Sequence, residues 1–195
     1  MSRRRDLDEH NARVSQFERD GNVAGLIQEL GSTAQGRSKY SIPRADAALA
    51  LGRMRATEAT PHLVKLIHDP EMMVRMCVFE ALGVMQAKDA SDAMIDGLKD
   101  PHRVPRQAAA EALGRVGAVE AIPKLREVLD TDPDGDTRLH AIESLLILGA
   151  SDVRDRVPEV LRSVGWRVRS TPRWKRLKEA AQTGEPLTPW FNSSE

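Results

Sequence analysis

The apolar positions of this chain follow a helical period, and the helical segments themselves recur along the sequence. From about residue 43 to residue 164, apolar residues three and four apart form short runs that Asp-Pro or glycine breaks separate. This pattern predicts antiparallel helix pairs at 43–55 with 58–68, 71–86 with 89–99, 103–116 with 119–130, and 135–148 with 152–164. We therefore expect an all-α protein.

The predicted pairs repeat at a nearly constant step. Arg44, Arg75, Arg106 and Arg138 stand at the same place in successive pairs and are spaced by 31, 31 and 32 residues. A fixed period of roughly 20–50 residues is typical of solenoids, in which each unit buries its apolar face by stacking on its neighbours. The sequence thus predicts an α-solenoid of about four to five repeats.

Glycines recur late in the first helix of three pairs, at Gly52, Gly83 and Gly114. Glycine inside a helix costs about 1 kcal/mol relative to alanine, so its recurrence needs a packing reason. We expect the second helix of each pair to approach the backbone at these points, where a Cβ atom would hold it away.

Less regular segments flank the array. Two short predicted helices and a linker precede it and would cap it, and a basic helix follows it. A polar tail ends the chain and carries Trp190 and Phe191, which either fold back onto the solenoid or dock into a partner. The predicted division is 1–42 for the N-terminal cap, 43–164 for the solenoid, 165–182 for the basic helix and 183–195 for the tail.

The repeats resemble HEAT repeats, in particular the short bacterial kind found in phycobilin lyases. The resemblance covers residues 43–164 and implies a right-handed α-solenoid whose second helices line a concave face. The third pair carries the fullest pattern, Asp100-Pro101, Pro105-Arg106, Glu111-Ala112-Leu113-Gly114 and Ala121-Ile122-Pro123-Lys124-Leu125.

The resemblance also explains the recurrent arginines. In HEAT-like proteins an aspartate and an arginine bond in a ladder across successive units, and charge-assisted bonds of this kind fix the register between repeats. We therefore interpret the matching residues as structural rather than as a ligand-binding stripe. They are Asp69, Arg75, Asp100, Arg106, Asp132 and Arg138.

Exposed positions of the second helices are the candidate binding residues of the concave face. Matching registers give Lys65, His68, Asp96, Lys99, Glu127 and Asp130. Their mixed charges favour a polar protein surface as the ligand over a phosphate backbone. The leading hypothesis is therefore a non-catalytic scaffold or adaptor that binds a protein or peptide.

A basic segment at 154–178 supports an alternative hypothesis. It holds nine basic and two acidic residues, although the whole chain has a formal net charge of zero. Basic residues interleaved with tryptophan suit nucleic acid or an acidic protein, yet the same tryptophans could instead pack the last helix onto the solenoid as a cap. The candidate patch is Arg162, Trp166, Arg167, Arg169, Arg173, Trp174, Lys175 and Arg176.

Other chemistry finds little support in the sequence. Cys77 is the single cysteine and lies in an apolar run, so we expect a buried residue. The histidines lack metal-ligand spacing, and no phosphate-binding loop or nucleophile elbow is present, so we expect no metal, no cofactor and no catalytic residue. A lyase-like accessory enzyme is the second alternative. No apolar run has membrane-spanning length and no secretory signal is recognisable, which predicts a soluble, cytoplasmic protein.

Overall fold

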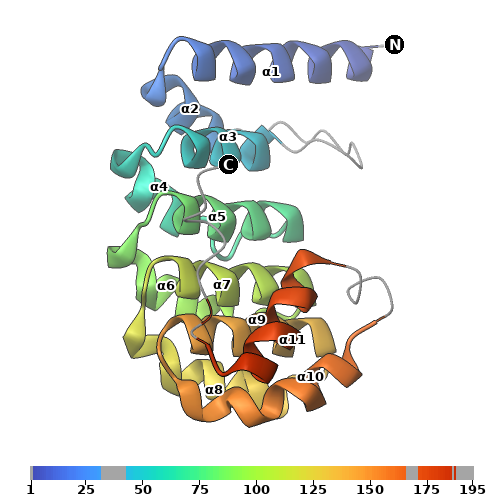
Figure 1. Cartoon of the computed structure of the whole chain (residues 1–195). Helices are drawn as coiled ribbons and strands as arrows, with labels where there is room; N and C mark the ends of the chain where they lie inside the picture. Colours follow the sequence, from blue (N-terminus) through green and yellow to red (C-terminus); the bar gives the residue numbers. More distant parts are fainter. Residues whose placement is uncertain (1, 32–42, 166–170, 186, 188–195) are drawn as a thin grey trace. The chain divides into compact units, whose positions relative to one another are not determined.

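The computed structural model of this chain describes residues 2–31, 43–165, 171–185 and 187 (Figure 1). All regular elements in these ranges are helices, which confirms the predicted all-α class. The α-helices are α1 (Ser2–Arg19), α2 (Val23–Leu30), α3 (Pro43–Arg53), α4 (Thr60–Val64), α5 (Met72–Val84), α6 (Ser91–Gly97), α7 (Arg103–Arg115), α8 (Ile122–Thr131), α9 (Gly135–Ile147), α10 (Val157–Ser163) and α11 (Pro172–Thr183).

The chain forms two compact units, residues 1–93 and residues 94–195, and the boundary between them in the sequence falls within α6. In each unit, first helices pack on first helices of the next pair, α3 on α5 in the first unit and α7 on α9 in the second. Second helices are shorter and connect them. The predicted division at residues 42, 164 and 182 stays a prediction.

A single 3₁₀ turn precedes most of the second helices, as at Thr57–Ala59 before α4 and Val119–Ala121 before α8. Proline follows at the first helical positions of α4, α8 and α10, where its missing N–H leaves no bond unmade. This local chemistry explains why each pair turns within a few residues.

Two second helices end earlier than the sequence indicates. The helix predicted at 58–68 stops at Val64, and that at 89–99 stops at Gly97. The chain then tightens into i to i+3 bonds, such as Asp69 N–H to the Leu66 carbonyl and Lys99 N–H to the Asp96 carbonyl. The tightening leads directly into the Asp-Pro turn, because proline disfavours a helical residue before it.

The close approach expected at the repeated glycines occurs, but with a different helix. A Cβ on Gly52 would lie 2.8 Å from the Ala81 Cα in α5, and one on Gly114 would lie 2.6 Å from the Ser144 Oγ in α9. The predicted partner, the second helix of the same pair, was therefore wrong. The glycines let first helices of successive repeats pack backbone to backbone.

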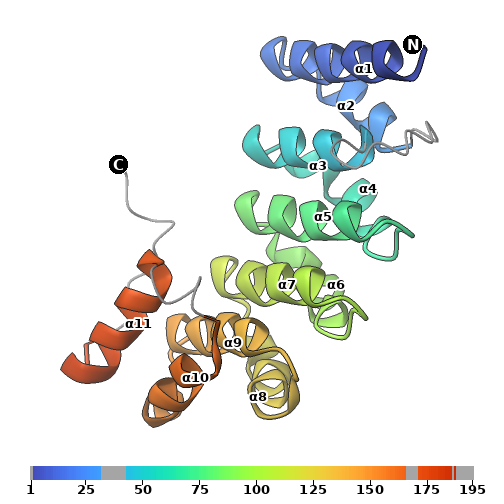
Figure 2. The same ribbon diagram turned by 90° about the vertical axis from the view of Figure 1, so that its right-hand side faces the viewer.

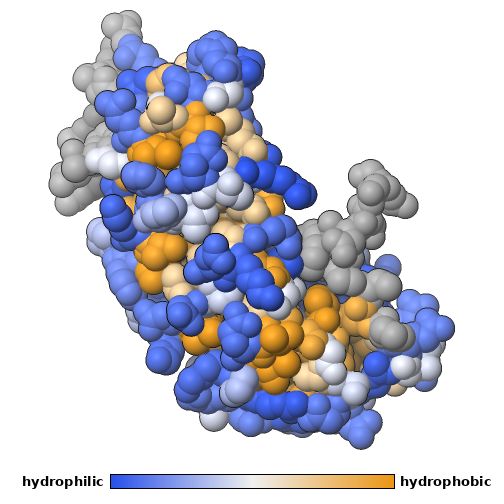
Figure 3. All heavy atoms as spheres, turned by 90° about the vertical axis from the view of Figure 1, so that its left-hand side faces the viewer, coloured by the Kyte–Doolittle hydropathy of each residue, from blue (hydrophilic) through white to orange (hydrophobic). Residues whose placement is uncertain are grey.

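Apolar side chains fill both cores, with Leu51, Leu82 and Phe79 fully buried in the first unit and Leu113, Leu125 and Ile142 in the second. Cys77 is also buried, and burial raises the pKa of its thiol to about 12, which fits an inert core residue. Figure 3 shows apolar residues at the surface only in patches that hydrophilic side chains interrupt.

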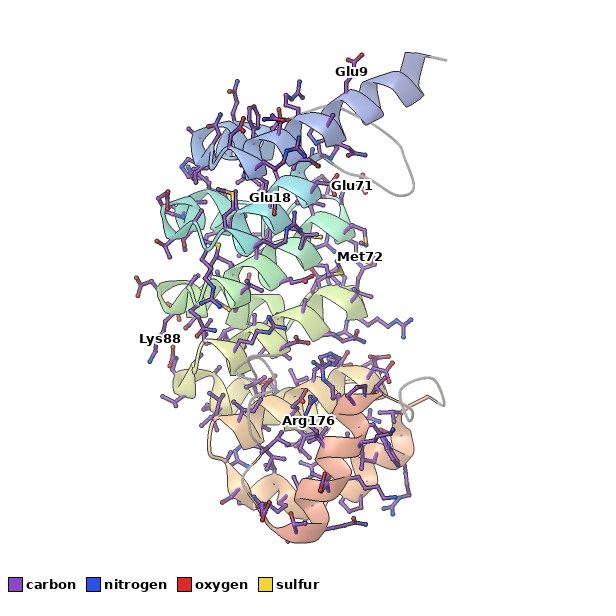
Figure 4. All side chains as sticks on the ribbon, turned by 45° about the horizontal axis from the view of Figure 1, so that its top comes forward. Glu9, Glu18, Glu71, Met72, Lys88 and Arg176 are labelled. Atoms are coloured by element: carbon purple, nitrogen blue, oxygen red, sulfur yellow. The ribbon has the colours of Figure 1, made fainter. Side chains whose placement is uncertain are left out.

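An ion pair ties the first helix of the chain to the array. Arg53 of α3 binds Glu18 of α1 through Nε–Oε1 and Nη2–Oε2 contacts of 2.6 and 2.7 Å (Figure 4 labels Glu18). Val14 of α1 is buried as the helical pattern predicts. In the first unit, α1 therefore packs through the apolar Val14 and through ion pairs to α3, at Glu18–Arg53, and to α2, at Arg13–Glu29.

In the second unit, α11 lies on the side of α7 and α9 that faces away from α6 and α8 (Figures 1 and 2). The Thr171 side chain accepts a bond from the Trp174 N–H at the start of α11, and Gly184 ends the helix in the left-handed conformation at φ 76°. The second unit consequently offers two different surfaces, one on α6 and α8 and one beneath α11.

Candidate functional site

A pocket of about 270 Å³ lies between the end of α6 and α8 in the second unit. Ile95, Leu98 and Val128 give it an apolar wall, and Lys99, Lys124 and Glu127 stand exposed at its rim. Arg106 and Asp132 also line it but are largely buried, with side chains 13% and 6% exposed. The pocket thus combines an apolar wall, a rim of both charge signs and a polar base that is already paired.

That polar base is a rung of the predicted arginine–aspartate ladder. Arg106 Nε donates to Asp132 Oδ2 at 2.7 Å and its Nη2 donates to Oδ1 at 3.0 Å. Its third nitrogen, Nη1, donates to the Asp100 carbonyl at 2.9 Å. The guanidinium therefore joins the turns that begin two successive repeats.

The same bonds recur elsewhere in the chain. Arg44 holds the Asp69 carboxylate at 2.7 and 3.0 Å. Arg75 and Arg138 each donate to the carbonyl of the aspartate six residues earlier, at 2.7 and 2.5 Å. The six-residue spacing in the sequence therefore marks a bond to the backbone, whereas the ion pair joins residues 25 or 26 apart.

The ladder aspartates also organise their own turns. Asp69, Asp100 and Asp132 each accept a bond from the backbone N–H two residues later, at 2.8 to 2.9 Å. These side chains are buried, and their oxygens are used within the fold. A structural assignment of the ladder agrees with all of these contacts.

The six predicted concave-face residues are all exposed, as a binding surface needs, and they are divided between the two units. Only Lys99 and Glu127 line the pocket. Asp130 is engaged by Arg156 in an ion pair, whereas Lys65 and His68 follow α4 in the first unit. Asp96 lies on α6 near the pocket in sequence but is not part of its lining.

Lys124 is a pocket residue that the sequence reading missed. Its Nζ lies 2.7 Å from Glu127 Oε2, one helical turn away on α8. The hydrogen bond from Lys124 lowers the pKa of Glu127, and the charges of Lys124 and Lys99 add to this effect. The signal was available, because residues three apart on a helix share a face.

A second polar site lies beneath α11. Arg173 Nη2 is 2.5 Å from Glu111 Oε2 of α7, and Arg173 Nε is 2.5 Å from Glu143 Oε2 of α9. Arg173 Nη1 also contacts His140 Nε2. Arg176, labelled in Figure 4, adds a 3.2 Å contact from Nη2 to Glu143 Oε1.

The protonation states at this second site follow from burial and charge. Burial is the main cause that lowers the pKa of His140 to about 4, and the positive charge of Arg173 is the second cause. The ring is therefore neutral at pH 7. His140 Nδ1 lies 2.8 Å from the Asp136 carbonyl, which can only accept, so Nδ1 carries the proton and Nε2 is free to accept from Arg173. Burial raises the pKa of Glu143. Burial is also the largest effect on Glu111, but the charge and hydrogen bond of Arg173, together with the nearby His140 and Arg115, outweigh it and lower the pKa of Glu111.

These contacts bear on the hypothesis that the basic segment at 154–178 binds nucleic acid. Arg173 and Arg176 point inward, and Lys178 lies over the Trp174 ring at 5.2 Å from its centroid. Arg162 and Lys175 are exposed. Trp166, Arg167 and Arg169 lie outside the described residues, as do Trp190 and Phe191. The described part of the patch supports the cap hypothesis more than a surface for nucleic acid.

In residues 9–31, 43–165 and 171–185, no three His, Cys, Asp or Glu side chains are grouped so that they could hold a metal ion. Over the described part of the chain, no helix is both long and apolar enough to cross a membrane.

The similarity of the chain to known proteins shows its family. A HEAT repeats model matches residues 27–113 and 91–172, so the chain belongs to the HEAT-repeat family. A solved structure, "The structure of the complex of CpcE and CpcF of phycocyanin lyase from Nostoc sp. PCC7120", is similar over 84% of this chain and 68% of that chain, with 26% identity and a TM-score of 0.68. No curated protein matches the chain.

Proposed function

We propose that this chain is a HEAT-repeat scaffold or adaptor that binds a protein or peptide partner on its second-helix surface. The observation that carries the proposal is the pocket between α6 and α8, which joins an apolar wall to a charged rim. A partner would insert one apolar side chain into the pocket and pair its own charges with Lys99, Lys124 and Glu127.

The character of the rim favours a protein over a phosphate chain. Two cations and one anion stand together there, and recognition of a protein surface matches charges of both signs. A phosphate backbone needs a run of cations instead. Arg173 and Arg176, which would have contributed to such a run, are paired with Glu111 and Glu143.

The structural relative lends support of a different kind. That solved structure is a complex of two proteins, CpcE and CpcF, and one chain of it is similar to this chain over 84% of this chain's length. An interaction role on a HEAT framework is therefore consistent with the likeness. Solenoid repeats in general offer extended surfaces for partners.

Affinity capture from the native host tests the proposal with paired variants. Lys99→Glu combined with Glu127→Lys exchanges the charges of two of the three rim residues, while Glu9→Lys combined with Lys88→Glu makes the matched exchange on the first unit. Glu9 and Lys88 are exposed there and labelled in Figure 4. We expect wild type and control to retain one nuclease-resistant protein partner that the rim variant loses. A partner held equally by both variants would contradict the proposal.

A lyase-like accessory role is the second candidate, because the similar solved structure belongs to a phycocyanin lyase. The test is to incubate the chain with phycocyanin, alone and with its captured partner, and to follow the pigment by absorbance and denaturing gel. Transfer or release of pigment that depends on the chain would favour this candidate over a purely structural role.

A further inference from the structure

The surface of α7 and α9 beneath α11 is built around a single guanidinium. Glu111 Oε2 and His140 Nε2 accept hydrogen bonds from Arg173, and Glu143 Oε2 lies at ion-pair distance, 2.5 Å from the Arg173 Nε. The acceptors come from two different helices, so packing of α7 on α9 fixes their spacing. Arginine matches such an arrangement because its planar fork carries donors in several fixed directions.

The second arginine of α11 extends the contact along the helix. Arg176 follows Arg173 by three residues and therefore lies on the same face of α11. Its Nη2 reaches Glu143 Oε1, so the buried Glu143 carboxylate has one arginine at each oxygen. Glu143 is only 4% exposed, and Arg173 and Arg176 of α11 both pair with it.

Apolar residues and packing on α10 also hold α11. Leu177 and Ala180 are its buried residues, and Trp174 is half-buried with its indole N–H buried and unbonded. The arginines thus connect α11 to α7 and α9. A buried carboxylate such as Glu143 needs a cation there, because an unpaired buried charge is strongly unfavourable.

We propose that this α7–α9 surface is an arginine-directed docking site for a helix, filled in this structure by α11 and available to an arginine-bearing helix of a protein partner when α11 leaves. The helix α11 shows the chemistry that such a partner helix would need. It carries Arg173 and Arg176 at positions i and i+3, and the apolar Leu177 one helical turn after Arg173. Helices that lay one face on a prepared surface are a recurring mode of peptide recognition. The site is separate from the α6–α8 pocket and does not depend on it.

The test removes α11 from the site in the full chain and supplies the helix in trans. Arg173→Glu combined with Arg176→Glu places four carboxylates together and should expel α11. The probe is a fluorescein-labelled peptide with the sequence of residues 171–185, followed by fluorescence anisotropy. We expect it to bind this variant at least about tenfold more tightly than wild type, in which α11 competes from within the chain.

Two controls identify the chemistry. A peptide with lysine in place of both arginines should bind about tenfold more weakly, because lysine cannot reproduce the two-point contacts. Adding Glu143→Gln to the expelled variant should weaken the native peptide by a similar factor. Circular dichroism checks that each variant is folded, and Arg173→Ala serves in place of the double variant if that one is not.

Three results would overturn the proposal. The first is a folded, expelled variant that does not bind the peptide. The second is equal binding of the arginine and lysine peptides. The third is binding that Glu143→Gln leaves unchanged, because the contact would then be apolar and unspecific.

Discussion

Arg106 holds Asp132 by two parallel bonds, 2.7 and 3.0 Å long, and so ties the first helix of one repeat to the turn that begins the next. A third bond from the same guanidinium reaches the Asp100 carbonyl. One side chain therefore connects three consecutive parts of the second unit. Because the pocket between α6 and α8 has this pair at its base, the shape of the pocket depends on it.

The ladder predicts a measurable loss of stability. Arg106→Ala should lower the free energy of unfolding by about 1–3 kcal/mol, because it leaves a buried carboxylate and a carbonyl without their donor. Urea denaturation followed by circular dichroism measures the change. The matched control is Arg103→Ala on the same helix, since its contact with Asp134 is 3.5 Å long and its side chain is 62% exposed.

The control should change stability by less than about 0.5 kcal/mol, as is usual for exposed ion pairs. If Arg106→Ala is as mild as Arg103→Ala while partner binding is lost, the arginine is a ligand contact and the structural assignment fails.

The glycine contacts make a second prediction. Gly52→Ala should destabilise the fold by about 1–3 kcal/mol, although alanine is the better helix former, because its Cβ would lie 2.8 Å from the Ala81 Cα. Gly31→Ala is the control, since this residue is exposed at φ −83° and the nearest atom to an added Cβ is at 3.4 Å.

Thermal unfolding distinguishes the two glycines. Gly31→Ala should be neutral or stabilise by up to about 1 kcal/mol, through the lower entropy of the unfolded chain. An unchanged melting temperature for Gly52→Ala would mean that the first helices can separate without cost.

The buried histidine gives a third prediction, on pH. The pKa of His140 falls from 6.5 to about 4 on folding, so the folded state favours the neutral ring. The corresponding stability is fully present above pH 6.5 and is lost as the pH falls towards 4, by about 3 kcal/mol in total. Other groups also act on the pKa of His140, namely Arg173, Glu111, Asp134 and the Asp136 carbonyl. The test below leaves these groups unchanged.

The difference between wild type and His140→Gln isolates this contribution. We expect the two free energies of unfolding to converge as the pH drops from 6.5 to 5, because only wild type loses the histidine contribution. In this range, the raised pKa of Glu143 acts with the opposite sign, but it is shared by both proteins. Parallel profiles would show that His140 is not held neutral by the fold.

Much of the fold could be predicted from local pattern. Val23–Leu30 has the bounds that its apolar spacing indicates, and α5, α7 and α9 lie within the predicted first helices. Proline positions and the 31-residue step mark where the chain must turn. Neighbouring residues are therefore enough to predict these turns. The early ends of α4 and α6 were missed because their last turns carry helical apolar spacing but adopt 3₁₀ bonds before proline.

The site was harder to predict, since it rests on contacts distant in sequence. Arg173 meets Glu111 across 62 residues, and no local signal tells an inward arginine from a solvated one. Gly52 likewise meets the next repeat rather than its own second helix. Lys124 beside Glu127 was within reach of sequence reasoning, because the helical register alone places them on one face.

The most direct measurement of the central claim is hydrogen–deuterium exchange of the chain with and without its captured partner. We expect slower exchange in residues 95–99 and 124–131, which flank the α6–α8 pocket, and unchanged exchange in α1 and α2. Protection absent from both pocket segments, in a complex shown to be saturated, would contradict the proposal that this surface holds the partner.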